Sequence, residues 1–499
     1  MRPRTLLVAG LVGLSLLAAC REQGQSDSAG FPERAIQELG ALRLATSPAE
    51  WLPSHPRDRL ETFTPGLASQ NDSWCALARR EDTLPGGARL VRDAYFYPPD
   101  PPVGLALPPD TEGPSLVARY CRLGAIWLET PQPDSQIGVR LALQTKRAMS
   151  SQFAREVTFE DPLGPGPGGR FGPAFSGSAR WTAKGRWEDG AVTAISAYDR
   201  AFGEANRSRV LVVAFLPISR FGMLDSELDG HAEQYGQEAA LVGEAARLSG
   251  LDQSKVTRLM SVLAQAESAF TERTHPNLPA LKSAAVATLG EWLGSARSLD
   301  AARRAPALLS ADRVLANQAV VYVLAQDEDS ATREALQALG AHFVYAQLGA
   351  TYVYTHTWLN EALRLDPDGR AGVLAFMSLA RAGFDTTGMC EGGFSAVIER
   401  GEQFIPRLRD TTLKAELHVL VGDAHADIVG LAAGLGQGYA DTGAYVARAP
   451  EARAKAVAHY RAGLALDHGS AMARRAWLGA WRLLAGLPPS TTHFFCVYD

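Results

Sequence analysis

The sequence predicts an α+β protein of several domains, in which an antiparallel β-rich N-terminal domain precedes an all-α domain. Two hydrophobic periods support this class. Apolar residues recur at every second position between about residues 88 and 217, which is the spacing of strands with one buried face. From about residue 224 they recur at helical spacing, and proline and glycine become sparse. With 499 residues, of which 46% are hydrophobic, the chain is long enough for about three domains.

The β-rich domain is expected over residues 31–220, with two hairpins and a central strand. The apolar run 116–128 and the alternating segment Ile137–Leu143 predict the first hairpin. The second joins strands at 180–187 and 191–198 through a turn that contains Asp189-Gly190, a pair that tolerates positive φ. Arg209–Leu216 is apolar on both faces, so we expect it to be a central strand.

The all-α domain is expected over residues 221–490. Its predicted helices include 332–347 and 352–365, which carry closely spaced aromatic and histidine side chains. We expect most of these side chains to be core. A concave helical surface lined by Tyr, Trp and His can also hold a peptide or a small ligand. The candidate ligand-binding residues are therefore Tyr345, Tyr352, His356 and Trp358.

The N-terminus has the layout of a secretory signal. Arg2 and Arg4 precede the uncharged apolar run Leu6–Ala19, which is too short to span a bilayer as a helix. Small residues then lead to Cys20, and this order resembles a bacterial lipobox.

The lipobox resemblance implies that residues 1–19 are removed and that Cys20 carries a lipid such as palmitate, which would anchor the chain to a membrane. Residues 20–30 are polar without periodicity and predict a flexible tether. Arg21, in place of an aspartate, implies the outer membrane, with the folded chain facing the periplasm. The alternative is an ordinary cleaved signal in which Cys20 is incidental.

Four further cysteines are expected to form disulfides, because disulfides persist in an oxidising compartment. Of three possible connectivities, the simplest pairs Cys75 with Cys121 and Cys390 with Cys496. The bridge between Cys390 and Cys496 would attach the apolar C-terminal tail 491–499 to the rest of the protein. A metal or redox site is the alternative, but the chain has no Cys-x-x-Cys.

Two helix endings resemble tetratricopeptide repeats. Trp358–Pro367 and Ala456–Asp467 both contain Leu-x-Leu-Asp, which Pro367 follows in the first segment, and their aspartates are 101 residues apart, close to three repeats of about 34 residues. The resemblance implies stacked helix pairs that present a binding surface. A generic helical bundle remains the alternative.

The sequence contains no standard catalytic, cofactor or metal motif, so we assign no catalytic residue, cofactor or metal. One polar cluster lies within the expected helix 413–433. His418 and His425 share a face but are too far apart along the axis for one metal ion, at a rise of about 1.5 Å per residue. Asp423 and Asp427 form an adjacent pair that we expect to be solvated. A structural role is the preferred interpretation of the cluster, and a metal or acid–base role is the alternative.

These observations predict a membrane-anchored periplasmic lipoprotein that binds or scaffolds an envelope protein through its helical-repeat surface. With a formal charge of −5, the chain has no excess of positive charge that would attract the phosphates of nucleic acid in general. The alternatives are a periplasmic hydrolase with a site at the β/α junction, or a solute- or glycan-binding accessory of an envelope transport system. Whether the protein is an enzyme stays open at this point.

Overall fold

The computed structural model describes residues 30–40, 46–62, 74–85, 87–99, 101–102, 104–107, 113–131, 135–152, 158–160, 179–187, 190–199, 209–215, 226–272, 277–325, 330–346, 351–381, 393–435, 443–467 and 469–489. The chain divides into two compact units. The N-terminal unit contains the described parts of 1–101, 108–225 and 484–490, and the helical unit contains those of 102–107 and 226–483. The class is therefore α+β, and each unit is described by itself.

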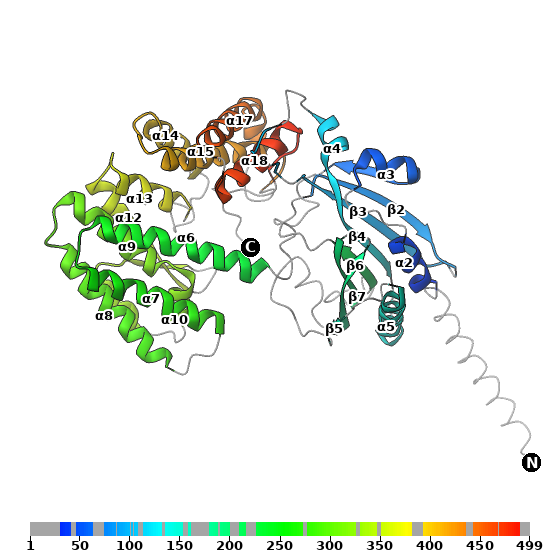
Figure 1. The fold of residues 1–499 in the computed structure, drawn as a ribbon, viewed down its shortest axis with the longest axis horizontal. Coiled ribbons are helices and arrows are strands. Elements are labelled where there is room, and N and C mark those ends of the chain that lie inside the picture. The colour runs from blue at the N-terminus through cyan, green and yellow to red at the C-terminus, as the bar shows by residue number, and fades with distance from the viewer. Residues whose placement is uncertain are drawn as a thin grey trace, which may run out of the picture. The chain divides into compact units, whose positions relative to one another are not determined.

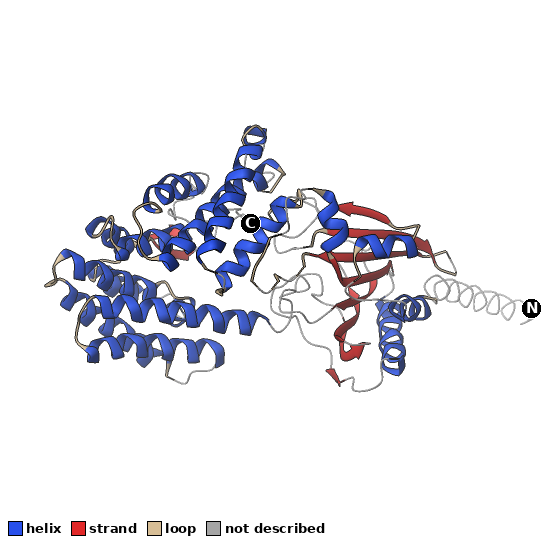
Figure 2. Ribbon diagram, turned by 45° about the horizontal axis from the view of Figure 1, so that its top comes forward, coloured by secondary structure: helices blue, strands red, loops and turns tan. Residues whose placement is uncertain are grey.

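The N-terminal unit is built on an eight-stranded antiparallel sheet in the order β1-β2-β3-β4-β8-β7-β6-β5. Figures 1 and 2 show its strands lying side by side. The described strands are β1 (Arg59–Thr62), β2 (Ala76–Thr83), β3 (Arg89–Tyr97), β4 (Arg122–Pro131), β5 (Thr158–Glu160), β6 (Ala179–Trp187), β7 (Gly190–Asp199) and β8 (Arg209–Phe215).

The second predicted hairpin and the central strand are confirmed. β6 pairs antiparallel with β7, with Trp187 opposite Gly190 at the turn. β8 lies between β4 and β7, inside the sheet.

The first predicted hairpin is wrong. Residues 114–120 form the short helix α4 (Pro114–Tyr120) before β4, and Ile137–Leu143 lies within α5 (Ser135–Gln152). Ile137, Leu141 and Thr145 recur every fourth residue, and Leu141 and its neighbour Ala142 are both buried. Neighbours in a strand would point to opposite faces, so the helical spacing outweighs a short alternation.

Helices cover one region of the sheet in the N-terminal unit. α5 packs against β6, β7 and β8, and α2 (Phe31–Gly40) packs against α5. Arg92 of β3 is buried, pairs with Glu38 of α2 at 2.7 Å and also pairs with Asp58. The guanidinium lies 5.4 Å from the ring centre of Trp51, which belongs to α3 (Pro48–Ser54). Buried ionic partners and a ring face thus compensate the desolvation of Arg92.

The N-terminal unit contains the disulfide Cys75–Cys121, as the sequence predicts. It joins the residue before β2 to the residue before β4, two strands apart in the sheet. The expected lipidation site Cys20, the expected pair Cys390 and Cys496, and the tail 491–499 lie outside the described residues.

In its described segments, the helical unit is a packed array of helices with one short hairpin. The helices are α6 (Ser226–Leu248), α7 (Gln253–Glu272), α8 (Leu278–Ala296), α9 (Ala301–Leu315), α10 (Gln318–Ala325), α11 (Ser330–Ala338), α12 (Thr357–Leu365), α13 (Arg370–Arg381), α14 (Gly393–Phe404), α15 (Thr411–Ala432), α16 (Gly443–Val446), α17 (Ala449–Leu466) and α18 (Ala471–Leu484). Among the described residues, none of the helices combines the length and apolar character that a membrane crossing requires.

Two of the predicted helices are partly wrong. The segments expected at 332–347 and 352–365 contain a two-stranded sheet of β9 (Phe343–Ala346) and β10 (Thr351–Tyr354), between α11 and α12. Aromatic and β-branched residues dominate both strands, FVYA and TYVY, and such residues favour a pleated surface over a helix. Each strand has only four residues, so its alternation is short.

Candidate functional site

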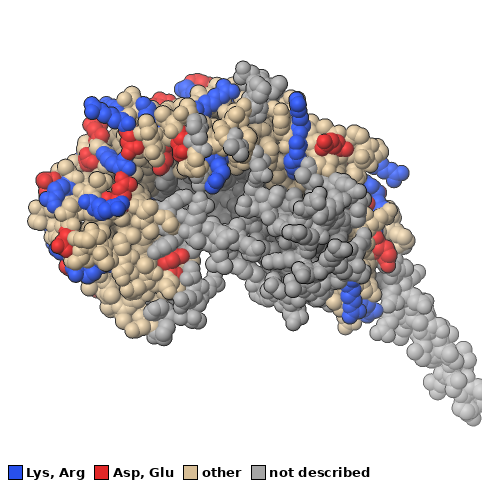
Figure 3. Space-filling model, in the orientation of Figure 1, with Lys and Arg blue, Asp and Glu red and all other residues tan. Residues whose placement is uncertain are grey.

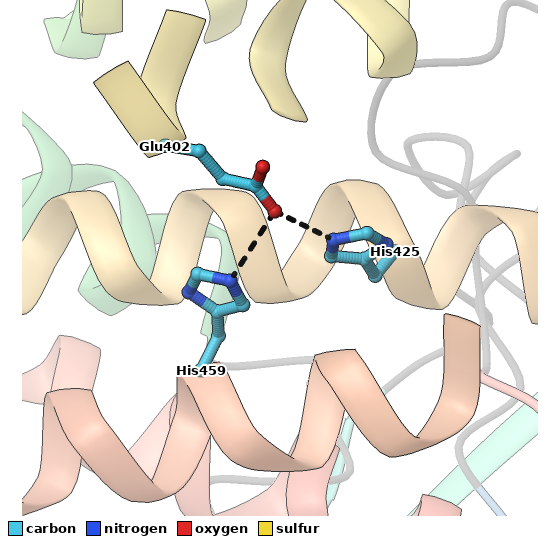
Figure 4. Close-up of side chains that lie close together, drawn as sticks. All are labelled: Glu402, His425 and His459. Atoms are coloured by element: carbon cyan, nitrogen blue, oxygen red, sulfur yellow. Dashed lines mark ion pairs between the residues drawn. The ribbon is translucent and has the colours of Figure 1, made fainter. Parts of the chain in front are cut away.

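The candidate site lies where three helices of the helical unit meet. Glu402 comes from α14, His425 from α15 and His459 from α17. Figure 4 shows the carboxylate of Glu402 between the two imidazole rings. We call these three residues the Glu402 cluster.

The helix α15 explains why histidine stands in the interior here. Residues 419–431 are all buried, and α15 packs against α14, α16 and α17. A helix covered on most sides is apolar around most of its circumference, so a polar side chain on it faces a neighbouring helix instead of water. His425 is 4% exposed, whereas Glu402 keeps about half of its side-chain surface in solvent.

The ligand atoms of the cluster are close but not in direct hydrogen-bond contact. Glu402 Oε1 lies 3.7 Å from His425 Nε2 and 4.0 Å from His459 Nε2. One ligand atom from each residue lies within 4.8 Å of the other two. Neither ring nitrogen of His425 has a hydrogen-bond partner within the described part of the chain.

His418 reaches the cluster through His459. Its Nδ1 lies 3.1 Å from Nδ1 of His459, and the ring centres are 5.2 Å apart. His459 thus lies between His418 and His425, whose ring centre is 5.8 Å away on the other side. The two histidines of α15 remain too far apart to share an ion, but the third histidine connects them.

All three histidines are held in the neutral form. Burial is the main cause that lowers the pKa of His418 to about 4, and repulsion from a protonated His459 is the second. Burial is likewise the main cause that lowers the pKa of His459 to about 4, and repulsion from a protonated His425 is the second. Burial also lowers the pKa of His425, and Lys455 acts in the same direction. Neutral imidazoles carry the lone pairs that a metal ion or a proton donor needs.

The acidic pair expected beside these histidines is not solvated, which corrects the prediction. Asp423 and Asp427 are 2% and 0% exposed. Asp423 accepts hydrogen bonds from the Tyr460 hydroxyl at 2.8 Å and from Arg475 at 2.6 Å. Both aspartates lie in the buried part of α15. Because this helix is covered on most of its faces, amphipathic spacing alone predicts the wrong exposure for them.

Tyr460 lies in a slot between two glycines. A Cβ atom at Gly422 of α15 or at Gly479 of α18 would come within 2.8 Å of its ring. Both positions therefore have to be glycine for α17 to pack between these two helices. This packing fixes the position of His459, one residue before Tyr460.

The candidate ligand-binding residues lie on the hairpin and just beyond it, instead of on two helices. Tyr345 lies opposite Tyr352, and Phe343 lies opposite Tyr354 on the same face. The ring centres of these pairs are 5.2 Å and 5.6 Å apart. We call these four residues the aromatic ladder. Trp358, on α12, is core at 3% exposure, with its ring centre 5.7 Å from that of Tyr354.

The inner end of the ladder is fixed by Asp312 of α9, which is fully buried. Its carboxylate accepts a hydrogen bond from the Tyr354 hydroxyl at 2.7 Å and lies 2.9 Å from His356 Nδ1. Burial and the Asp312 charge raise the pKa of Tyr354 well above its usual value. The outer end differs, because Tyr345 and Tyr352 are 53% and 47% exposed. The guanidinium of Arg333 lies 3.7 Å from the ring centre of Tyr352.

A pocket of about 760 Å³ lies in the N-terminal unit and is open to solvent. Its lining includes Arg34, Arg57 and Arg80 together with Glu33 and Asp82. Arg34 and Arg80 both pair with Asp82, so these charges largely compensate one another. The described residues of the lining include neither histidine nor cysteine, and we assign the pocket no chemistry.

Sequence reasoning found His418 and His425 but not the cluster. Glu402 and His459 lie on other helices, and nothing in their local sequence distinguishes them from ordinary surface residues. The aromatic residues of the ladder alternate along the chain, but each run is only four residues long. Comparisons with protein-family models, curated proteins and solved structures gave no match for this chain.

Proposed function

We propose that the protein is a lipoprotein anchored through Cys20 to the periplasmic face of the outer membrane, where its helical unit binds an envelope protein. The observation that carries the binding function is the exposed outer end of the aromatic ladder. The lipobox resemblance supports the location. The Cys75–Cys121 disulfide agrees with it, since disulfides persist outside the reducing cytosol.

The outer ladder has the composition of a protein-binding surface. Tyrosine and arginine are enriched at protein interfaces and are frequent among the residues that dominate binding energy. Tyr345, Tyr352 and Arg333 are in contact, and both rings are held on a hairpin whose inner end is buried. Rigid anchoring lowers the entropic cost of binding.

The charge distribution agrees with a protein partner. On the face drawn in Figure 3, Lys and Arg alternate with Asp and Glu over the described surface of the helical unit. A surface of mixed sign favours recognition through local contacts over attraction to a polyanion.

A tetratricopeptide-like arrangement is part of the proposal. Both Leu-x-Leu-Asp segments end helices, α12 and α17, and each aspartate accepts backbone N–H groups of the following turn or helix. Stacked helix pairs of this kind present extended binding surfaces. The hairpin is an insertion into that series.

The binding proposal is tested by copurification from membranes with the full anchored chain. The variant carries Tyr345→Ser and Tyr352→Ser, and the matched control carries Val446→Ser and Leu466→Ser, which also replace exposed apolar residues of the helical unit. We expect a specific protein to copurify with the wild type and the control. Its recovery with the tyrosine variant should fall by about 30-fold, the effect of about 2 kcal/mol of lost hot-spot binding. Equal recovery with all three chains would contradict the proposal.

A further inference from the structure

The Glu402 cluster combines features that a hydrogen-bonded structural contact lacks. His425 is almost completely buried, yet neither of its ring nitrogens has a hydrogen-bond partner within the described residues. Buried polar atoms are nearly always satisfied, and an unsatisfied one calls for an explanation such as a bound ion. The Nε2 atom of this ring faces the carboxylate of Glu402, as Figure 4 shows.

The donor set fits one class of ligand. Two imidazole nitrogens and one carboxylate oxygen are the protein ligands of many zinc sites, with bond lengths of about 2.0–2.2 Å. The three atoms lie within 4.8 Å of one another, so small side-chain rotations bring all of them onto one ion. The half-exposed carboxylate of Glu402 leaves a path for the ion from solvent.

We propose that Glu402, His425 and His459 bind one zinc ion and that His418 is a positioning residue for the ring of His459. The ion would satisfy the buried Nε2 of His425 and connect α14 to α15 and α17. Nothing in the proposed partner binding requires this site, so the two proposals stand separately.

The role of His418 follows from the contact between its Nδ1 atom and Nδ1 of His459. A hydrogen bond between Nδ1 of His418 and Nδ1 of His459 requires one proton between them. When His459 donates, its Nε2 carries the free lone pair, and this is the atom that faces Glu402. Metal-binding histidines commonly donate their second N–H to a neighbouring group that fixes the ring.

The surrounding charges are compatible with a cation. Lys455, on the same helix as His459, is paired with Glu451 at 3.0 Å. Among the described residues, Lys414 on α15 is a second cation that acts on the histidines, through His418. A divalent ion bound to Glu402 would thus lie in a region where one lysine is already neutralised by its partner.

The test uses the full-length chain without a histidine tag, stripped with a chelator and titrated with Zn²⁺ in competition with a chromophoric chelator. We expect one equivalent to bind. Co²⁺ bound in place of Zn²⁺ should give the visible absorption of a site with nitrogen and oxygen ligands and a low coordination number. Glu402→Gln keeps the shape of an exposed side chain and should weaken Zn²⁺ binding at least tenfold. Glu399→Gln, which replaces another exposed carboxylate on the same helix, is the matched control and should bind as the wild type does.

The results also separate the ligands from the positioning residue. His418→Gln should keep the one-to-one stoichiometry and weaken Zn²⁺ binding by about 10- to 100-fold, the range found for groups that orient a ligating histidine. If His418→Gln binds Zn²⁺ with unchanged affinity, His418 does not position the ring of His459. The absence of saturable binding at one equivalent, or equal affinities of Glu402→Gln and Glu399→Gln, would overturn the metal site.

Discussion

Asp312 determines the local structure around the inner end of the ladder. This fully buried carboxylate accepts hydrogen bonds from the Tyr354 hydroxyl and from the backbone N–H of Leu359 at 3.3 Å, and it contacts His356. His356 has a φ of 52°, which is unusual for a residue other than glycine. The contact with Asp312 helps to hold that strained backbone at the start of α12.

Replacement of Asp312 should therefore cost more than the loss of one hydrogen bond. Asp312→Ala removes the acceptor for the proton of the buried Tyr354 hydroxyl, which then keeps only the N–H of Trp358 as a donor, and we expect the free energy of unfolding to fall by about 3 kcal/mol. The measurement is urea unfolding of the full chain. Tyr354→Phe serves as the second variant, because its effect should be smaller in the Asp312→Ala background than in the wild type. Additive effects would show that the two groups do not act together.

At the scale of elements, the junction between α12 and α13 shows what the Leu-x-Leu-Asp ending does. Asp366 Oδ2 accepts hydrogen bonds from the N–H groups of Ala371, at 3.0 Å, and Gly372, at 3.3 Å, in the first turn of α13. These N–H groups have no partner inside their own helix. A Cβ at Gly372 would overlap the Asp366 carbonyl oxygen, so the close turn also requires glycine there.

Loss of this cap has a predictable effect on stability. Asp366→Ala should lower the free energy of unfolding by about 1 kcal/mol, the usual cost of a lost capping residue. Asp368→Ala is the control, because Asp368 pairs with Arg407 at the surface and such pairs contribute about 0.5 kcal/mol or less. Chemical denaturation of the two variants makes the comparison. If Asp366→Ala is no more destabilising than the control, the capping role is wrong.

Elements with a long pattern that fits only one type of secondary structure could be predicted. Short elements, and segments whose pattern fits both a strand and a helix, could not. The hairpin of β6 and β7 had a turn signal, and β8 was apolar on both faces. In contrast, β9 and β10 have four residues each, too few to outweigh the flanking helical pattern. Ile137–Leu143 fits a strand and a helix equally well, and only its continuation to Gln152 decides for the helix.

At the scale of the whole molecule, the sequence predicts the α+β class but not the long-range pairings. β4 and β8 are neighbours at the centre of the sheet although α5 and three strands separate them in the chain. The Glu402 cluster likewise joins three helices whose local sequences are ordinary. Local periodicity reports which face of an element is buried, whereas tertiary packing determines which elements meet.

The function proposed for the whole molecule depends on its attachment to a membrane. The proposal places this attachment on a lipid at Cys20, on the basis of the lipobox resemblance, with the polar residues 21–30 as a tether.

The most direct test is the mass of the N-terminal peptide of the mature protein, isolated from membrane and soluble fractions of cells that produce it. We predict a peptide that begins at Cys20 and carries the added mass of fatty acyl chains, found in the membrane fraction. A Cys20→Ser variant should lose that mass and leave the membrane. An unmodified Cys20 within an uncut N-terminus, in a protein that remains soluble, would contradict the account.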